Sequence, residues 1–316
     1  MAQVRSSLDM HCGKKVIDFM RWNKVVFLCS IILLIVSISI VSIRGFNWGL
    51  DFTGGTVIEL KLERPVDLDL VRYNLKKIGL GQHKVQNLES LYDLIIQIAP
   101  KEDFEGTTLS SKVVSTINNS IGQNVIVTRI EVIGPRVGEN LPRDAGIALF
   151  SAWIAIFIYI SYRFSWKLSL GVVLALIHDI VITIGLLSIF KIEIDLTIIA
   201  SLLSVIGYSL NDKIVVSDRI RENFFTMFSF IPYYIINLSL TQTLIRTIIT
   251  SLITLVMAGV LFIFGGSLLK GFSLTMIIGI IIGTISSVYV SSSLSLKIGL
   301  QRENMFPQML DNKNQD

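Results

Sequence analysis

Six stretches of this 316-residue chain are long and apolar enough to cross a lipid bilayer. They cover residues 25–43, 145–162, 168–190, 196–217, 247–264 and 272–294. A membrane-spanning helix needs about 20 predominantly apolar residues, and only the third and fourth stretches contain Asp or Lys. The sequence therefore predicts an α-helical integral membrane protein with six transmembrane helices.

The composition excludes a water-soluble protein of ordinary type. Hydrophobic residues make up 52% of the chain and charged residues 16%, whereas soluble domains carry roughly 25% charged residues. The mean hydropathy is +0.65. The net charge of +4 is small and unevenly placed, so it indicates membrane orientation rather than binding to nucleic acid. Cys12 and Cys29 have neither metal-ligand spacing nor a disulfide framework, and we expect no metal and no cofactor.

The first apolar stretch is interpreted as an uncleaved anchor. Its 19 residues exceed the roughly 7–15 apolar residues of a signal peptide, and no small-x-small cleavage site follows at residues 44–48.

Lysine and arginine in tails and short loops predict the orientation. One side of the membrane would carry Arg5, Lys14, Lys15, Arg21, Lys24, Arg163, Lys167, Arg219, Arg221, Arg246, Lys297, Arg302 and Lys313, and the other side only Lys191 and Lys270 in its short loops. The tails 1–24 and 297–316 are therefore expected in the cytoplasm, and the segment 44–143 on the far side.

The segment 44–143 is predicted to form a folded α+β domain. Strands are predicted at 56–62, 84–88, 91–98 and 124–133, and helices at 68–78, where Asp67 is the candidate N-cap, and at 109–117. This is the split, ferredoxin-like order of strands and helices. Within 144–296, a further interfacial helix is predicted at 228–244, around Pro232. No internal repeat is visible.

Charged residues inside membrane helices are functional candidates. Asp179 lies in the third stretch beside His178, and Asp212 lies in the fourth between Asn211 and Lys213. Asp212 shares a mostly polar helical stripe with Ser201, Ser204, Tyr208, Val215 and Arg219. We favour a protonatable carboxylate in a proton path for Asp212, over a structural hydrogen-bond cluster. For His178 and Asp179 the two interpretations are equally weighted.

Residue type and position alone do not decide the roles of two cations, Arg246 and Lys213. Arg246, at the start of the fifth stretch, reads as an arginine that snorkels to the interface. Lys213 either snorkels as well or acts on the ionisation of Asp212. In the sixth stretch, Gly279, Gly283, Ser287, Ser291 and Ser295 recur every fourth residue, which indicates close helix packing.

Enzyme interpretations fit poorly. Asp212 lacks the glycine-rich approach expected in an intramembrane aspartyl protease, and Leu210 stands where an intramembrane serine protease would have glycine after Ser209. Gly54-Gly55 is not followed by the Gly-Lys-Ser/Thr of a phosphate loop. We expect no enzyme activity.

Four motifs resemble one known family. They are residues 46–56 (FNWGLDFTGGT), 132–138 (VIGPRVG), 207–223 (GYSLNDKIVVSDRIREN) and 239–251 (SLTQTLIRTIITS). In this order they resemble the SecF subunits of the SecD/SecF family of bacterial protein export, over nearly the whole chain. The family resembles half transporters of the RND superfamily, so the resemblance implies a SecD-like partner that supplies the other half.

The resemblance also implies a function. The family uses the proton-motive force to assist late preprotein translocation through the SecYEG channel, while ATP is spent by the SecA motor; a YajC-like small membrane subunit is a further expected partner. Localisation would be the bacterial inner membrane, with 44–143 in the periplasm.

The resemblance carries over to particular residues. Asp212 matches the family's proton-coupling aspartate, Arg246 the arginine that stabilises or regulates it, and Arg219 a structural or gating position. Asp51, Gly54, Gly55, Gly134 and Pro135 belong to the motifs that flank the outer domain. Lys213 departs from the family, which has a small hydroxyl residue there.

The resulting hypothesis is a proton-coupled conformational cycle. Ionised Asp212 would pair with Arg246 or with hydroxyls such as Ser204 and Tyr208, and protonation would release them. Movement would pass to the outer domain through residues 134–144 and 44–56. The alternatives are a non-catalytic assembly subunit and a proton-driven small-molecule exporter.

Overall fold

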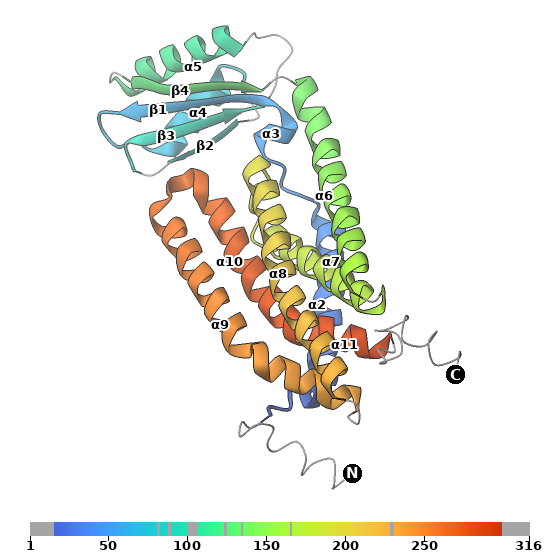
Figure 1. The fold of residues 1–316 in the computed structure, drawn as a ribbon. Coiled ribbons are helices and arrows are strands. Elements are labelled where there is room, and N and C mark those ends of the chain that lie inside the picture. Colours follow the sequence, from blue (N-terminus) through green and yellow to red (C-terminus); the bar gives the residue numbers. More distant parts are fainter. Residues whose placement is uncertain are drawn as a thin grey trace.

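The computed structural model describes residues 16–80, 83–87, 90–99, 106–122, 125–133, 135–164, 166–227 and 231–298. Long helices form a bundle, and a small α+β domain covers one end of it (Figure 1).

Six helical segments in the described part of the chain are long and apolar enough to span a membrane, which confirms the predicted number. The first consists of the 3₁₀ turn η1 (Phe19–Trp22) and α2 (Asn23–Arg44). The next four are α6 (Pro135–Arg163), α7 (Trp166–Ile189), α8 (Leu196–Thr226) and α9 (Pro232–Phe264). The sixth is α10 (Gly266–Val288), continued after a break at Tyr289 by α11 (Val290–Lys297).

The separate interfacial helix predicted at 228–244 is wrong. Residues 232–264 form one continuous helix, α9, with Pro232 in its first turn. Proline is favoured at that position because the missing N–H has no helical partner there. No glycine or further proline interrupts residues 233–246, so nothing in the chain ends the helix before the apolar stretch begins.

Helix α7 lies at the centre of the bundle. Most of its residues are buried, whereas few residues of α2 and α6 are. It packs against α2, α6, α8, α10 and α11. The charged pair His178-Asp179 is therefore placed in the protein interior and not against lipid.

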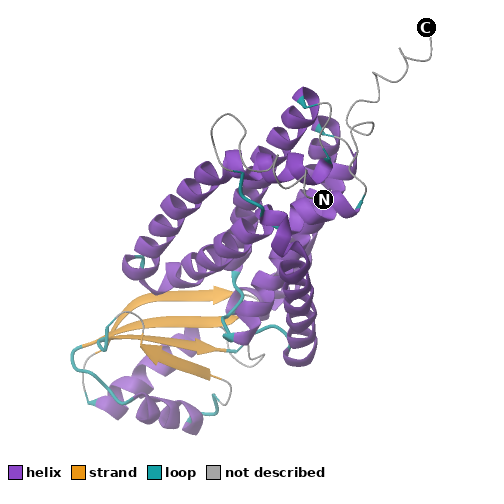
Figure 2. Cartoon of the chain, turned by 90° about the horizontal axis from the view of Figure 1, so that it is seen from below, coloured by secondary structure: helices purple, strands orange, loops and turns teal. Residues whose placement is uncertain are grey.

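The outer domain has the predicted order of elements: β1 (Gly55–Leu62), α4 (Leu68–Lys77), β2 (His83–Asn87), β3 (Asp93–Ile98), α5 (Gly106–Ile121) and β4 (Val125–Ile133). The strands form one antiparallel sheet in the order β2-β3-β1-β4. Figure 2 shows both helices on the sheet face that points away from the bundle.

The sequence patterns explain this domain. Alternating apolar residues of β1, such as Ile58 and Leu60, meet Leu75 of α4 and Ile117 of α5 in a buried core. Asp67 caps α4 as predicted, because its side chain accepts a hydrogen bond from the Asp69 backbone N–H.

Candidate functional site

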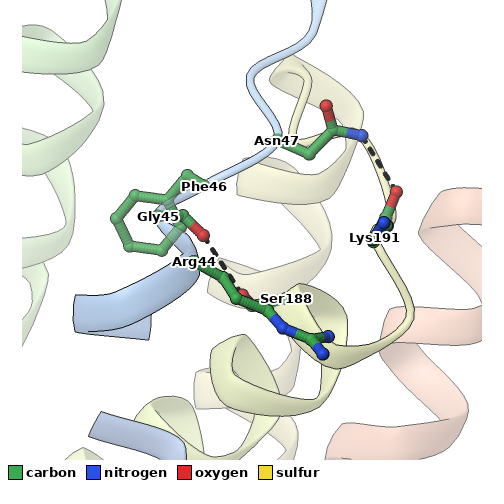
Figure 3. Close-up of a pocket in the computed structure, with 6 residues that line it drawn as sticks. All are labelled: Arg44, Gly45, Phe46, Asn47, Ser188 and Lys191. Carbon is green, nitrogen blue, oxygen red and sulfur yellow. Dashed lines mark hydrogen bonds between the residues drawn. The ribbon is translucent and has the colours of Figure 1, made fainter. Parts of the chain in front are cut away.

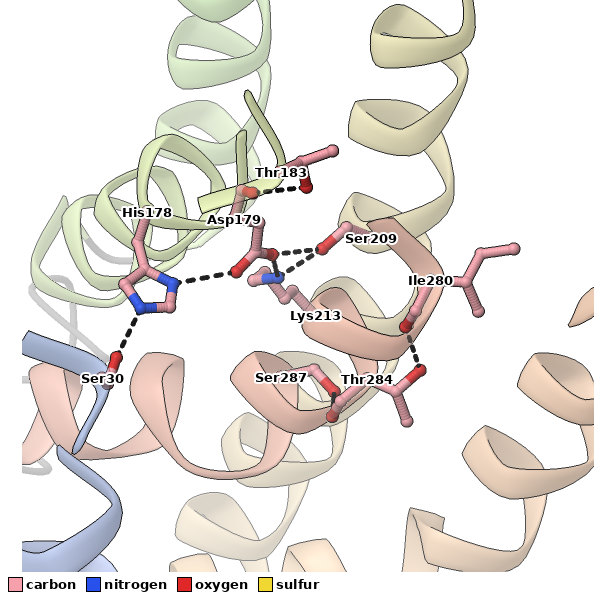
Figure 4. A network of polar contacts seen from close by, with 9 residues as sticks. All are labelled: Ser30, His178, Asp179, Thr183, Ser209, Lys213, Ile280, Thr284 and Ser287. Atoms are coloured by element: carbon pink, nitrogen blue, oxygen red, sulfur yellow. Dashed lines mark hydrogen bonds and ion pairs between the residues drawn. The ribbon is translucent and has the colours of Figure 1, made fainter. Parts of the chain in front are cut away.

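A buried acid–base network joins α7 to α8 (Figure 4). The Asp179 carboxylate accepts from Lys213 Nζ and from Ser209 Oγ, both at 2.7 Å from its Oδ2. Lys213 and Asp179 are 0% and 1% exposed. A buried charge is tolerated where an opposite charge and hydrogen bonds compensate it, and each ion of this pair has both.

His178 extends this network to a third helix. Its Nδ1 lies 3.1 Å from Asp179 Oδ1, and its Nε2 contacts the Ser30 hydroxyl of α2. We call His178, Asp179, Ser209 and Lys213 the α7–α8 charge network. It joins the predicted site at His178 and Asp179 to Lys213 on α8, and it shows that Lys213 does not snorkel to the interface.

Asp212 occupies a different environment from its neighbour Lys213. Its side chain is 3% exposed, and its Oδ2 is buried with no hydrogen-bond partner among the described residues. Ser251 of α9 lies beside the carboxylate, and the charges of Lys213 and Arg246 act on it. A buried carboxylate oxygen without a partner is costly as part of an ion, so this group is unlike the satisfied Asp179.

The predicted polar stripe on α8 divides in two. The Tyr208 hydroxyl donates to Ser251 Oγ at 3.0 Å, and Ser251 in turn contacts Thr284 of α10 at 2.8 Å. Ser204 is exposed and donates to the Ala200 carbonyl oxygen of its own helix. Tyr208 is thus part of the surroundings of Asp212, whereas Ser204 points away from them.

In the described part of the chain, two other polar residues of α8, Asn211 and Arg219, form no hydrogen bond with the Tyr208, Ser251 and Thr284 side chains that lie near Asp212. Asn211 is exposed. Arg219 lies further along α8, where its Nε donates to Gln242 Oε1 at 2.6 Å and its Nη1 pairs with Glu222. The link from α8 to Gln242 on α9 fits a structural role for Arg219.

Arg246 is exposed on α9. Among the residues that the structure describes, no ion pair or hydrogen bond joins it to Asp212. Its charge nevertheless lies close enough to act on Asp212, and the regulating role expected of Arg246 stays a prediction.

Close packing brings α10 against these groups. A Cβ atom on Gly279 would lie 2.4 Å from Val205 Cγ2, and one on Gly283 would lie 2.9 Å from Ser209 Oγ. The small residues predicted to allow close approach therefore do so at the level of the α7–α8 charge network.

A second set of contacts ties the outer domain to the start of α8. The Gly49 N–H donates to the Ile194 carbonyl oxygen, and the Ile194 N–H donates to the Asn47 carbonyl oxygen, each at 2.8 Å. Asp51, in the short helix α3 (Leu50–Thr53), accepts from the Leu196 backbone N–H at 2.9 Å. The carboxylate thus satisfies one of the free N–H groups at the N-terminus of α8.

The sheet of the outer domain also contacts the loop between α7 and α8. Lys84 of β2 forms an ion pair with Glu193, in the α7–α8 loop, and burial lowers the pKa of the Lys84 ammonium. Gly54 and Gly55 have φ values of 71° and 137°, which other residues adopt only with strain. Hence the glycine pair is required by the backbone where the chain enters β1.

The connection after the sheet is helical. Pro135 begins α6, which continues without interruption into the membrane. Gly134 lies outside the described residues.

Sequence reasoning missed the partners of its own candidates. Ser30 and Thr284 are common residue types in apolar helices and gave no signal, while Ser209 and Ser251 were noted for other reasons and not as partners of the charged residues. The Asp179–Lys213 pair did have one, since opposite charges inside a membrane protein are expected to pair.

Comparison with known proteins identifies the family. Residues 113–301 match the family described as protein export membrane protein SecD/SecF, C-terminal, and residues 40–66 match the SecD/SecF GG motif. The chain is 52% identical to the protein translocase subunit SecF of Escherichia coli O157:H7 over 317 aligned positions, which cover 100% of this chain and 98% of that protein. It is 46% identical to SecF of Vibrio alginolyticus, with 95% of each covered.

Solved structures agree with the sequence comparison. SecDF of Thermus thermophilus, described as a translocon-associated membrane protein, superposes with a TM-score of 0.79 at 33% identity over 91% of this chain. A second SecDF structure, in a super-membrane-facing form, gives a TM-score of 0.69 at 30% identity over 97% of this chain. The chain spans 39% and 41% of those two longer chains. It is a multi-pass membrane protein that belongs to the SecD/SecF family, among the SecF subunits of the protein translocase.

Proposed function

We propose that this subunit uses the proton-motive force to assist late preprotein translocation through a SecYEG channel, with Asp212 as the protonatable residue and Arg246 as its regulating partner. The observation that carries the proposal is the buried Asp212 Oδ2, which has no hydrogen-bond partner in the part of the chain that the structure describes. In that position the ionised form needs a counter-charge, and proton binding removes the need.

The α7–α8 charge network supports this assignment by contrast. Asp179 is fully compensated by Lys213, Ser209 and His178. Since the charge of ionised Asp179 is already balanced, binding a proton would not relieve an unfavourable buried charge. Of the two carboxylates, Asp212 is therefore the one suited to gain and lose a proton.

Arg246 suits the role of a movable counter-charge. It acts on Asp212 without contacting it, and its exposed position on α9 leaves the side chain free to swing. One charge crossing 100 mV supplies about 2.3 kcal/mol, enough to shift a two-state population by tenfold or more.

The contacts at the start of α8 support transmission to the outer domain. Asp212 lies 16 residues from Leu196, or about 24 Å along the helix. At Leu196 the helix is held by Asp51 and by the backbone bridge of Ile194 to residues 47–49. A shift of α8 would pull directly on the segment that leads into β1.

The proposal includes a SecD-like partner, a SecYEG channel, a YajC-like small subunit and a preprotein as substrate. The chain spans only about two fifths of the SecDF proteins it resembles, which supports a partner for the rest. Strand β4 lies at an edge of the sheet and exposes Ile126, Ile130 and Val132. Exposed apolar edges of this kind are candidate pairing surfaces. The proposed location is the inner membrane, with cytoplasmic termini and a periplasmic outer domain.

The test is proton-motive-force-dependent release of a preprotein from vesicles that carry the subunit with its SecD-like partner. Asp212→Asn and Arg246→Met should assemble normally and lose the dependence. The matched control is Glu63→Gln, which removes an exposed carboxylate from the outer domain and should behave as wild type. Wild-type release by both Asp212→Asn and Arg246→Met would disprove proton coupling through this pair.

The rival function is a scaffold that only assembles the translocase. The Tyr208–Ser251–Thr284 contacts, which tie α8, α9 and α10 together, favour it. The same experiment separates the two, because a scaffold that assembles normally should export normally.

A further inference from the structure

We propose that the pocket between the ends of α2 and α7 binds the phosphate headgroup of an anionic phospholipid in the leaflet next to the outer domain. The pocket has a volume of about 460 Å³ and is lined by Arg44, Gly45, Phe46, Asn47, Ser188 and Lys191. Figure 3 shows these residues around the space where α2, α7 and the loop after α7 meet.

The pocket is positively charged. Arg44 and Lys191 both line it, and no acidic residue does. Neither cation forms an ion pair with any residue that the structure describes. The nearest acid along the chain, Glu193, is already paired with Lys84. Two uncompensated cations in one cavity favour an anion, and phosphate oxygens suit both side chains.

The walls of the pocket are fixed in advance. Lys191 is the one non-glycine residue in the described ranges with a positive φ, at 53°, a conformation that persists where surrounding contacts enforce it. Here the Asn47 side-chain amide donates to the Lys191 carbonyl oxygen at 2.9 Å. On the other wall, the Ser188 hydroxyl donates to the Gly45 carbonyl oxygen at 3.1 Å. The strained backbone is therefore held from the α2 side, and the two halves of the pocket are joined.

The position of the pocket at the ends of two membrane-spanning helices favours a lipid as the source of the phosphate. Arg44 is the last residue of α2, and Ser188 lies one residue before the end of α7. Ile43 is 84% exposed and Phe190 is 63% exposed, so an exposed apolar residue that suits acyl chains directly precedes each cation in the chain. A pocket where spans leave the hydrocarbon, with cations above an apolar surface, matches the headgroup and chains of a phospholipid.

The experiment measures lipids retained by the purified full chain. The chain is reconstituted with equal amounts of phosphatidylglycerol and phosphatidylcholine, and retained lipids are counted by native mass spectrometry. The test variant combines Arg44→Gln with Lys191→Gly, since glycine keeps the positive φ. The control is Lys270→Gln, which removes an exposed cation from the N-terminal part of α10.

Each cation is worth a factor of about five in affinity for anionic lipid. The double variant should therefore lose about 25-fold in phosphatidylglycerol retention, with phosphatidylcholine retention and folding unchanged. Lys270→Gln should stay within about twofold of wild type. If the double variant fails to fold, Lys191→Asn alone, which also tolerates the backbone, should lose about fivefold.

Three outcomes would overturn the proposal. The first is equal phosphatidylglycerol retention by wild type and the double variant. The second is displacement of the lipid by millimolar inorganic phosphate, which would assign the pocket to free phosphate. The third is displacement by an acidic peptide, which would assign it to a polypeptide.

Discussion

Breaking the buried ion pair between α7 and α8 from one side is expected to destabilise the membrane domain severely. Asp179→Asn removes the carboxylate from a Lys213 ammonium that is 0% exposed. The ammonium then keeps only neutral acceptors from this pair of contacts, the Ser209 hydroxyl and the amide oxygen of the new asparagine, and loses its negatively charged partner. Removing one partner of a buried pair costs about 3–5 kcal/mol, and we expect the upper part of that range here.

The structure predicts an asymmetry between the two partners. Lys213→Met leaves Asp179 with two polar contacts, the Ser209 hydroxyl at Oδ2 and the His178 ring at Oδ1. We therefore expect a loss near the lower end, about 3 kcal/mol.

The double variant Asp179→Asn/Lys213→Met removes both charges at once. Replacement of a buried pair by uncharged groups of similar volume is often close to neutral. The double variant should thus fall within about 2 kcal/mol of wild type, and the coupling energy of the cycle should be about 3 kcal/mol or more.

An exposed pair supplies the matched control. Arg163 Nη2 and Asp218 Oδ2 are 2.8 Å apart, nearly the distance in the buried pair, but the two side chains are 44% and 42% exposed. Exposed pairs contribute about 0–1 kcal/mol. Asp218→Asn should therefore change the free energy of unfolding by no more than about 1 kcal/mol.

The assay is denaturant unfolding of the purified full chain in mixed micelles, followed by far-UV circular dichroism. The reasoning is refuted if the double variant is as unstable as the sum of the single variants. It is equally refuted if Asp179→Asn costs no more than the exposed control, because burial would then make no difference.

Two further predictions concern packing and transmission. Gly279→Ala should destabilise the chain by about 1–3 kcal/mol in the same unfolding assay, since its Cβ would meet Val205 at 2.4 Å. The control Gly259→Ala, whose Cβ would have nothing within 4 Å, should be neutral or stabilising by up to about 1 kcal/mol. Equal losses of stability in the two variants would contradict the packing argument. A disulfide between Lys84→Cys and Glu193→Cys, in a cysteine-free background, should abolish proton-driven export when oxidised and restore it when reduced; undiminished export by the oxidised form would show that no movement at this contact is required.

Local sequence features were sufficient for the architecture. Hydrophobic length marks a span without reference to its neighbours, because each apolar residue contributes independently to transfer into lipid. Alternation and capping likewise identified the strands and the Asp67 cap of α4. The error at 228–244 arose where composition changed but no residue in the chain ended the helix.

The candidate site could be predicted from local sequence features only in part. The sequence placed Asp179, Asp212 and Lys213 inside membrane helices, and their cost in lipid marked them as candidates. It could not say which acid Lys213 serves. Residues 212 and 213 are separated by about 100° around the helix axis, so they face different neighbours. Which neighbour lies on which side is a property of the packed bundle.

By itself, then, the sequence determined the number of spans, the α+β insertion and the identity of the charged residues, because these depend on local chemistry. The tertiary structure decided that Lys213 neutralises Asp179 and that Asp212 keeps an oxygen without a partner among the described residues. The physical reason is that pairing depends on helix rotation and close approach. Both are set by side chains far apart in the chain, such as Gly283 against Ser209.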